Sequence, residues 1–477
     1  MRKIHLIKYV LLFSLIVSAK GLAQYGSIGS VDAGSMGLAK TYTAVTKGIY
    51  SIGLNPANLI LEDTLKFQIV TVLPLPTLSA IGGSNVLSMD DVNYFFGGIN
   101  GESRYLNEND KQRLNSIFDN GGFLFTSASA QILSIGFIPD KKIGAFGFSI
   151  TDFSGGKIGV PSALVNLVLN GNPVNKAFDL SETQAHFWWI RNYSISFARK
   201  FDDLNIGIFK NLAAGISFKL VHGYAYGSTE KVDVDFFTSS AHELSSNTDF
   251  SAVTSFSDNF GIEYAFDTLS HNSHFELFPA PAGTGFGMDL GLSFKLLDKT
   301  LISVAITDIG SITWRRNTAR FTNKESLFLD DLTDRGKIDS LVDKFKADSE
   351  PAGEFSTGLA TAFRFGVALF LSEFDDDNFP GHLLLAADYN QGFNNLPGNS
   401  TSPRYSFGVE WGIVDFLPYV RTGVEYSEVG GFNWAFGIGF VTSLLEIYIA
   451  TNSVQTTLFP QSYSNLSMSL SSRWKFY

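Results

Sequence analysis

Several stretches of the chain alternate large apolar side chains with small or polar ones. From Phe432 to Phe440, every second residue is large and apolar, and the residues between them include Asn433 and Ala435. Because successive side chains of a strand point to opposite faces, this alternation predicts strands with one apolar face. The same pattern recurs in Leu212–Leu220, Phe286–Leu296, Phe355–Leu371 and Tyr405–Ile413. Strands of about ten residues with one face of glycine, serine and isolated charges are typical of membrane-spanning β-strands.

Composition supports a membrane protein built from strands. The chain has 45 glycines and 44 phenylalanines, and only 17% of its residues are charged, against about 25% in soluble domains. No internal stretch approaches the roughly 18 apolar residues of a transmembrane helix, so a closed sheet is the way to satisfy every backbone group in lipid. A soluble all-β fold would carry more Lys, Glu and Thr on its second face, since glycine weakens strands. We expect an all-β fold: a transmembrane antiparallel barrel of roughly 14 strands, with short helices in its loops.

The first 23 residues predict an export signal. Arg2, Lys3 and Lys8 precede a short apolar run, Tyr9–Ala19, and small residues place cleavage after Ala23. The run is too short to span a bilayer as a helix. Without cysteine the chain has neither a lipoprotein anchor nor disulfides. We therefore expect the cell outer membrane, with its lipid as the surroundings of the barrel. The net charge of -11 argues against nucleic-acid partners.

The C-terminal residues are similar to the final strand that barrel-assembly machinery recognises. Leu466, Met468 and Leu470 alternate with serines, and the chain ends in Trp474, Phe476 and Tyr477. The apolar face is in register with Phe476 instead of the last residue, and Ser472 interrupts it.

Three interruptions of the strand pattern predict helices, and one predicts a loop. Asn107 can cap a helix that bears Leu114, Ile117 and Phe118. Pro161 suits the first turn of a second helix, with Leu164, Leu167 and Val168. Ile338, Leu341, Val342 and Phe345 form the apolar stripe of a third. Residues 238–280 lack periodicity and are expected to form a long external loop.

Residues that could carry catalysis or bind metal are few. His271, His274 and Glu276 have a spacing that could hold a metal, and Asp375–Asn378 could hold calcium, but a solvated turn is the simpler interpretation of both. An outer-membrane lipase would need a serine and a histidine on neighbouring strands facing outward, and Ser217 with His222 is only a faint candidate for such a pair. We expect no enzyme activity, no metal site and no cofactor.

The most informative motifs lie just after the predicted signal. Gly34-Ser35-Met36-Gly37-Leu38-Ala39 is followed by Asn55-Pro56-Ala57-Asn58-Leu59. Small residues let a backbone lie close to other structure, and proline restricts Asn55 to extended geometry. These residues suit a segment folded inside a barrel. The alternative is a tight turn before the first strand.

These motifs resemble the start of the FadL-type long-chain fatty acid transporters and their PorV-like relatives. Those proteins show "A-M-G-G-A" and, about twenty residues later, "N-P-A-G-L". This chain departs from them at Leu38 and Asn58, and it has Lys47-Gly48 where an acidic residue is common. The motif-level resemblance covers only about 35 residues, and the general architecture, a plugged barrel of roughly 14 strands, covers the remainder.

The resemblance implies that residues 24–62 form a hatch that plugs the lumen of a barrel made by residues 63–477. The hatch motif would be Gly34, Met36, Gly37, Asn55, Pro56 and Ala57. It also implies transport of hydrophobic small molecules. The alternatives are a PorV-like accessory barrel that binds secretion or surface proteins, and a structural barrel without traffic.

Overall fold

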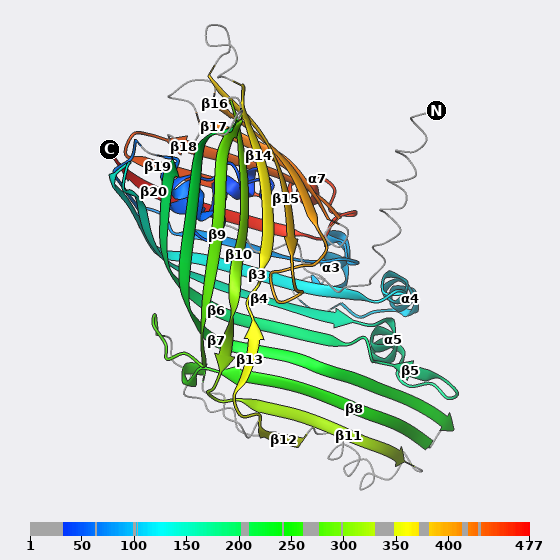
Figure 1. The fold of residues 1–477 in the computed structure, drawn as a ribbon. Coiled ribbons are helices and arrows are strands. Elements are labelled where there is room, and N and C mark those ends of the chain that lie inside the picture. The colour runs from blue at the N-terminus through cyan, green and yellow to red at the C-terminus, as the bar shows by residue number, and fades with distance from the viewer. Residues whose placement is uncertain are drawn as a thin grey trace, which may run out of the picture.

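The alternating segments form a closed antiparallel barrel of 14 strands (Figure 1). The computed structural model describes residues 32–62, 64–98, 102, 104–201, 209–240, 243–260, 276–296, 299–329, 348–371, 381–412, 418–427 and 431–477. The wall consists of β1 (Phe67–Val70) with β2 (Thr77–Ser84), β3 (Gly122–Asp140), β4 (Gly144–Val160), β6 (Gln184–Phe201), β7 (Phe209–Ser240), β9 (Gly283–Leu296), β10 (Thr300–Trp314), β13 (Phe355–Gly358) with β14 (Ala362–Phe370), β15 (His382–Gly392), β16 (Arg404–Gly412), β17 (Tyr419–Ser427), β18 (Gly431–Val441), β19 (Leu445–Thr451) and β20 (Leu466–Phe476). The expected fold class and strand number are confirmed.

The last strand closes the barrel against the first. Phe476 of β20 pairs with Phe67 of β1, and Leu470 pairs with Leu78 of β2. Each wall strand is therefore paired on both sides over much of its length, which gives the backbone groups their hydrogen bonds without water.

The two faces of the wall differ as the alternation predicts. In β18, Phe432, Phe436 and Phe440 are exposed on the outer face, whereas Asn433 and Ala435 are buried on the inner face. An apolar outer face around a closed antiparallel sheet is the form in which strands cross the bacterial outer membrane. The predicted location in the outer membrane is confirmed.

The two ends of the barrel differ in their connections. At one end, which we call the short-turn end, brief turns join Asp140 to Gly144 and Val441 to Leu445. The opposite end, the long-loop end, carries α3 (Met89–Phe96), α4 (Glu108–Ile117), α5 (Ser162–Asn170) and α7 (Val454–Leu458).

The expected helices are present where the structure describes them. Asn107 caps α4, as predicted, and Pro161 stands at the N-cap of α5. Helix α3, which the sequence did not predict, begins with a capping box of Ser88 and Asp91. Leu87, Phe95, Leu114 and Phe118 pack together between α3 and α4. The helix expected around residues 338–345 lies outside the described residues.

No helix in the described part of the chain is long and apolar enough to cross a membrane.

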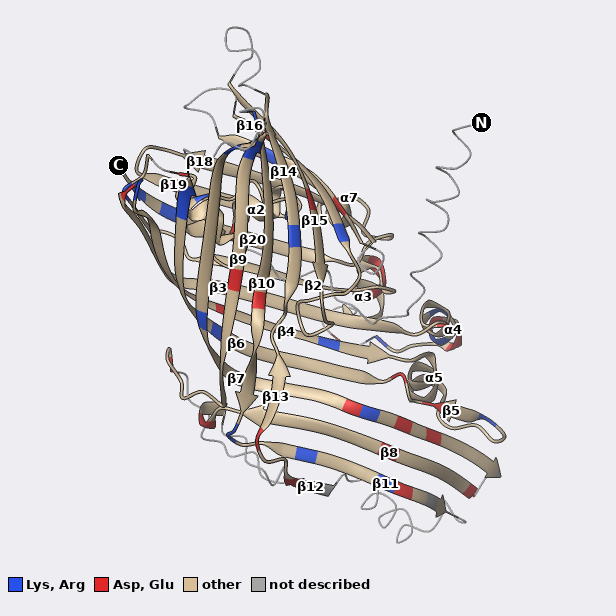
Figure 2. Ribbon diagram, viewed as in Figure 1, with Lys and Arg blue, Asp and Glu red and all other residues tan. Residues whose placement is uncertain are grey.

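On the side of β7, the wall extends beyond the barrel as a further sheet, at the lower right of Figure 1. Strand β7 pairs with β9 as far as Gly223 and from Ala225 onward with β8 (Glu243–Phe256). Strand β8 pairs with β11 (Ala319–Leu329), which pairs with β12 (Asp348–Pro351). Figure 2 shows charged residues along β7 and β11 in this sheet. The expectation of a loop over residues 238–280 is thus wrong for β8. Strands that stand clear of lipid need no apolar alternation, so β8 escaped recognition.

The stretch Phe355–Leu371, expected as one strand, is broken into β13 and β14. Its neighbour β10 has a register shift between Ile306 and Ile309, with Asp308 at a positive φ of 57°. Residues 359–361 lie opposite this irregularity. Leu359, expected on the outer face, is instead buried in an apolar cluster with Trp314 and Trp188.

A row of phenylalanines runs along the outer face at the short-turn end. Its five members occupy adjacent, directly paired positions on β20, β1, β3, β4 and β6: Phe476, Phe67, Phe137, Phe146 and Phe197. The Phe146 ring lies 5.3 Å from that of Phe137 and 5.0 Å from that of Phe197, measured between centroids. Aromatic girdles of this kind mark the membrane interface of such barrels.

Replacing the central member of this row tests its contribution to stability. We expect Phe146→Ala to lower the free energy of unfolding by about 1–3 kcal/mol, because two aromatic contacts are lost together with buried area. Guanidinium titration in lipid vesicles, followed by tryptophan fluorescence, measures the change. The control is Phe440→Ala, which removes an outward phenylalanine outside the row and should lower the free energy of unfolding less. Equal decreases in the two variants would contradict a special role for the row.

Candidate functional site

The N-terminal residues 32–62, which we call the inner segment, lie inside the barrel near its short-turn end (Figure 1, blue). The segment contains three short helices, α2 (Ala33–Gly37), η1 (Gly48–Ser51) and η2 (Pro56–Ile60). The Asp32 side chain caps α2, and Asn55 caps η2 with proline at its first position. Tyr42, Leu54 and Ala57 are completely buried.

Three pairs of glycines face the inner segment from the wall. In each pair the glycines lie directly opposite one another on neighbouring strands: Gly136 and Gly147 on β3 and β4, Gly215 and Gly291 on β7 and β9, and Gly408 and Gly423 on β16 and β17. Cross-strand neighbours of this kind lie about 4.5–5.5 Å apart. Each pair therefore forms a patch of bare backbone on the inner face.

Each patch receives a different part of the inner segment. Ile49 and Leu59 lie over the first pair, Pro56 and Ala57 over the second, and Leu38 over the third. A Cβ added at Gly408 would stand 3.0 Å from the Leu38 Cβ, and one at Gly215 would overlap the Pro56 carbonyl carbon. Larger residues in the wall would thus push the segment off its seat. Glycine in these strands is explained by this close approach.

The structure places all six residues of the predicted hatch motif inside the barrel. A Cβ at Gly37 would stand 3.0 Å from the Gly437 Cα, and Gly34 lies against Arg421. Met36 packs with Tyr448 and Ala450 of β19.

The second half of the motif binds the opposite side of the wall. The Asn55 amide donates to the Ser293 hydroxyl of β9 at 3.0 Å. Pro56 and Ala57 follow on the Gly215–Gly291 patch. Gly37, Pro56 and Ala57 of the motif thus lie directly against the backbone of the wall.

Charged groups of the wall bind the first half of the inner segment. The Asp388 carboxylate of β15 accepts hydrogen bonds from the Tyr42 and Thr43 backbone N–H groups at 2.9 and 2.8 Å. The Tyr42 hydroxyl in turn accepts from Arg364 at 2.6 Å and from Arg404 at 3.2 Å. All of these groups are buried. Removing one partner would leave a charge without compensation in the interior.

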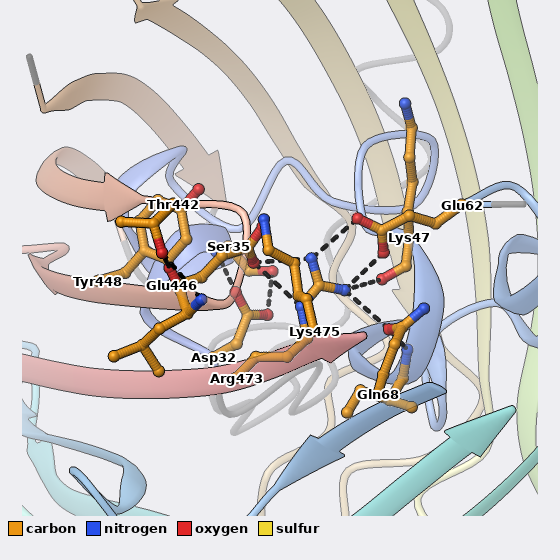
Figure 3. Close-up of polar contacts among 12 residues, drawn as sticks. Asp32, Ser35, Lys47, Glu62, Gln68, Thr442, Glu446, Tyr448, Arg473 and Lys475 are labelled. Carbon is orange, nitrogen blue, oxygen red and sulfur yellow. Dashed lines mark hydrogen bonds and ion pairs between the residues drawn. The ribbon is translucent and has the colours of Figure 1, made fainter. Parts of the chain in front are cut away.

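A second charged cluster surrounds Arg473 of β20 (Figure 3). Its guanidinium donates to Glu62 of the inner segment at 2.6 Å and to Glu446 of β19 at 2.7 Å. It also donates to the Gln68 side chain at 3.0 Å and lies over the Tyr50 ring. Burial raises the pKa of the Tyr50 phenol in spite of this guanidinium. The cluster joins the segment to the strands that close the barrel.

A cavity of about 320 Å³ lies between the first half of the inner segment, residues 32–47, and strands β14 to β20. Its lining is mainly polar and of both signs, including Glu62, Glu410, Arg421 and Arg473. Glu410 and Arg421, directly opposite one another on β16 and β17, form an ion pair in this lining. Several of residues 32–47 line this cavity, together with Tyr50 and Glu62, whereas residues 49–60 pack mainly against apolar side chains and glycine.

An aromatic cluster lines the inner wall toward the long-loop end, where the sheet rises. Tyr226 lies 5.1 Å from Trp314 and 5.6 Å from Phe355, measured between ring centroids. Trp188, Val221 and Val253 are buried in the same cluster, and Leu396 of the β15–β16 connection packs against it. We call these residues the aromatic cluster. The sequence did not predict it, because its members come from separate strands.

Of the chemical motifs in the sequence, the structure describes Ser217 and His222, and it does not bring these two side chains together. Ser217 is buried on the inner face and bonded to Ser196, while His222 lies beside Tyr193; residues five apart on a strand face opposite ways. His271, His274 and Asp375–Asn378 lie outside the described residues. Among the residues described, no three His, Cys, Asp or Glu side chains cluster as metal ligands.

Filling one glycine patch tests the seat of the inner segment. We expect Gly215→Val to displace Pro56 and Ala57, at a cost of about 1–3 kcal/mol typical of overpacking, and to raise single-channel conductance in planar bilayers. Gly156→Val is the control, because a Cβ there meets only ordinary contacts. Unchanged conductance of Gly215→Val would show that the segment yields without opening the barrel.

Solved structures that the chain is similar to include three bacterial barrels. The toluene transporter TbuX of Ralstonia pickettii is 12% identical, with a TM-score of 0.47 over 94% of this chain and 99% of that one. The toluene transporter TodX of Pseudomonas putida is 11% identical, with a TM-score of 0.45 over 95% and 98%. A FadL homologue of Pseudomonas aeruginosa is 12% identical, with a TM-score of 0.45 over 95% and 100%. FadL-type barrels, which the N-terminal motifs predict, are thus among them.

No curated protein matches the chain in sequence. A family model does match, and it covers residues 64–452, from just before β1 to just after β19. This range is most of the chain and nearly the whole barrel. The chain therefore belongs to the family described as a family of unknown function, DUF5723.

Proposed function

We propose that this protein is a gated outer-membrane channel for hydrophobic small molecules, with residues 24–62 as its hatch. The observation that carries the proposal is the seating of the inner segment across the barrel. Its contacts reach strands all round the wall, from Gln68 of β1 to Ser471 of β20. A segment held in this way closes the interior to solutes, and its movement would open it.

The contacts of the segment are unequal, and this favours a defined movement. Residues 49–60 are held by apolar packing on glycine, which water does not replace. Of residues 32–47, Leu38 rests on the Gly408–Gly423 pair, whereas Tyr42 and Thr43 are held by hydrogen bonds to Asp388 and several others border a polar cavity. Water can substitute for such polar contacts at modest net cost. We infer that residues 32–47 move while residues 49–60 remain seated.

The aromatic cluster supports a hydrophobic solute. Its rings line the inner wall at the end opposite the inner segment. Apolar ligands bind to surfaces of this composition. The solute would meet the cluster first and the hatch afterwards.

A reversible lock tests the hatch. Leu38→Cys with Gly408→Cys places two thiols at positions whose Cβ atoms are about 3.0 Å apart, close to disulfide geometry, and the chain has no other cysteine. We expect the oxidised double variant in liposomes to take up naphthalene no faster than protein-free liposomes, and reduction to restore uptake. The reduced double variant is the matched control, because it carries the same two substitutions without the bond, and full uptake by the oxidised protein would contradict the hatch.

A second function, docking of a secreted or surface protein, is favoured by the sheet that rises beyond the barrel. Lys231 and Asp249 pair on one face of it, and Arg320 pairs with Glu230. If this sheet docks a protein, affinity purification of the full chain in mild detergent should recover a stoichiometric partner. Deleting β8 and β11 should then abolish recovery. If the intact chain is recovered without a stoichiometric partner, this result would count against docking.

A further inference from the structure

Two buried hydrogen-bond donors on the inner wall, Lys157 and Trp188, have no acceptor in the described part of the chain. They are the Lys157 ammonium of β4 and the Trp188 indole N–H of β6. Lys157 is 9% exposed and Trp188 3%. Both groups can donate and neither can accept. Leaving such donors buried and unpaired is costly, so the site is suited to an acceptor from outside the chain.

The two donors are neighbours on the inner face. Lys157 lies opposite His186 in the register of β4 and β6, and Trp188 lies opposite Gly155, two residues from Lys157. A Cβ on Gly155 would stand 3.6 Å from Pro397 of the β15–β16 connection, which confirms that this face looks into the barrel. The two side chains therefore stand on the same face, at diagonal positions of neighbouring strands, which are about 7–8 Å apart in antiparallel sheets.

The surroundings of Lys157 favour a negative charge. Its ammonium lies 4.1 Å from the centroid of the Phe123 ring, and no carboxylate of the described residues forms an ion pair with it. His186 is engaged through its Nδ1 with the Ser228 hydroxyl at 2.9 Å. A buried ammonium with aromatic neighbours and no carboxylate is a strong partner for an anion, because charge-assisted hydrogen bonds are about twice as strong as neutral ones.

The apolar side of the same site is made of rings. Trp188 belongs to the aromatic cluster, in which Trp314 and Phe355 lie nearly parallel at 6.5 Å between centroids. Ring pairs gain energy beyond their buried area when they stack or meet edge to face. The rings of the cluster are buried, and Leu396 packs over them as a partly buried residue, so a ligand reaches the rings where Leu396 gives way. A flat ring system matches this cluster better than a long chain.

We propose that Lys157, Trp188 and the aromatic cluster bind an aromatic carboxylate. The carboxylate accepts from the Lys157 ammonium and the Trp188 indole, and the rings of the ligand lie on the cluster, where they displace Leu396. The inference deepens the proposed channel function by naming the class of solute that pauses at this site.

Equilibrium dialysis of the full chain in detergent, with empty micelles as blank, tests the site. The probes are 2-naphthoate, its neutral analogue 2-methylnaphthalene, and palmitate as a straight-chain carboxylate. We expect 2-naphthoate to bind about ten-fold more tightly than the neutral analogue. Lys157→Met should remove the preference for the carboxylate, and Lys157→Arg should keep it. Trp188→Phe should weaken the binding of 2-naphthoate a few-fold. Lys111→Met, on exposed α4, is the matched control.

Heat-dependent gel mobility shows that each variant is a folded barrel. Unchanged naphthoate binding by folded Lys157→Met would overturn the proposal, as would parity between naphthoate and its neutral analogue. Tighter binding of palmitate than of naphthoate would overturn the aromatic part. Failure of the channel is separate: naphthalene uptake through the disulfide-locked barrel would refute the hatch while Lys157-dependent naphthoate binding stood.

Discussion

Closure of the hydrogen-bond ladder is the constraint on which the rest of the structure depends. Because β20 pairs with both β1 and β2, the wall has a fixed circumference and cannot splay to make room for what it contains. A segment inside must fit the space that the wall leaves. The directly opposed glycines of β3–β4, β7–β9 and β16–β17 provide that space. The polar inner face then follows from the need to pair the charges of the segment and wall with each other.

Much of the fold was predictable because lipid imposes a rule on each strand separately. The alternation in β16, β18 and β9 is visible in the sequence, since one face of each must be apolar. Where lipid is absent the rule fails, as in β8, which lies in the sheet beyond the barrel. It fails also at Leu359, because a bulge in the neighbouring β10 redirects a side chain that local alternation assigns to the outside.

The candidate site was predictable only in its local part. Gly34, Gly37 and the Asn55–Ala57 turn indicate a close-packed segment, because small residues let the backbone approach other structure and proline fixes φ. The partners were not predictable. Arg364, Glu410 and Arg421 appear in the sequence as isolated charges on polar faces, and nothing local says that Arg364 reaches Tyr42, 322 residues away. Register and shear of the whole barrel bring such groups together.

The reach of the inner segment to β20 has a consequence for biogenesis. Ala33 donates to Ser471, and Glu62 accepts from Arg473, so residues near the start of the chain are completed by residues near its end. Their other partners, such as Gly215 and Asp388, lie in between. These contacts are complete only when β20 is in place. The step that closes the wall is therefore also the step that completes the filling of its interior.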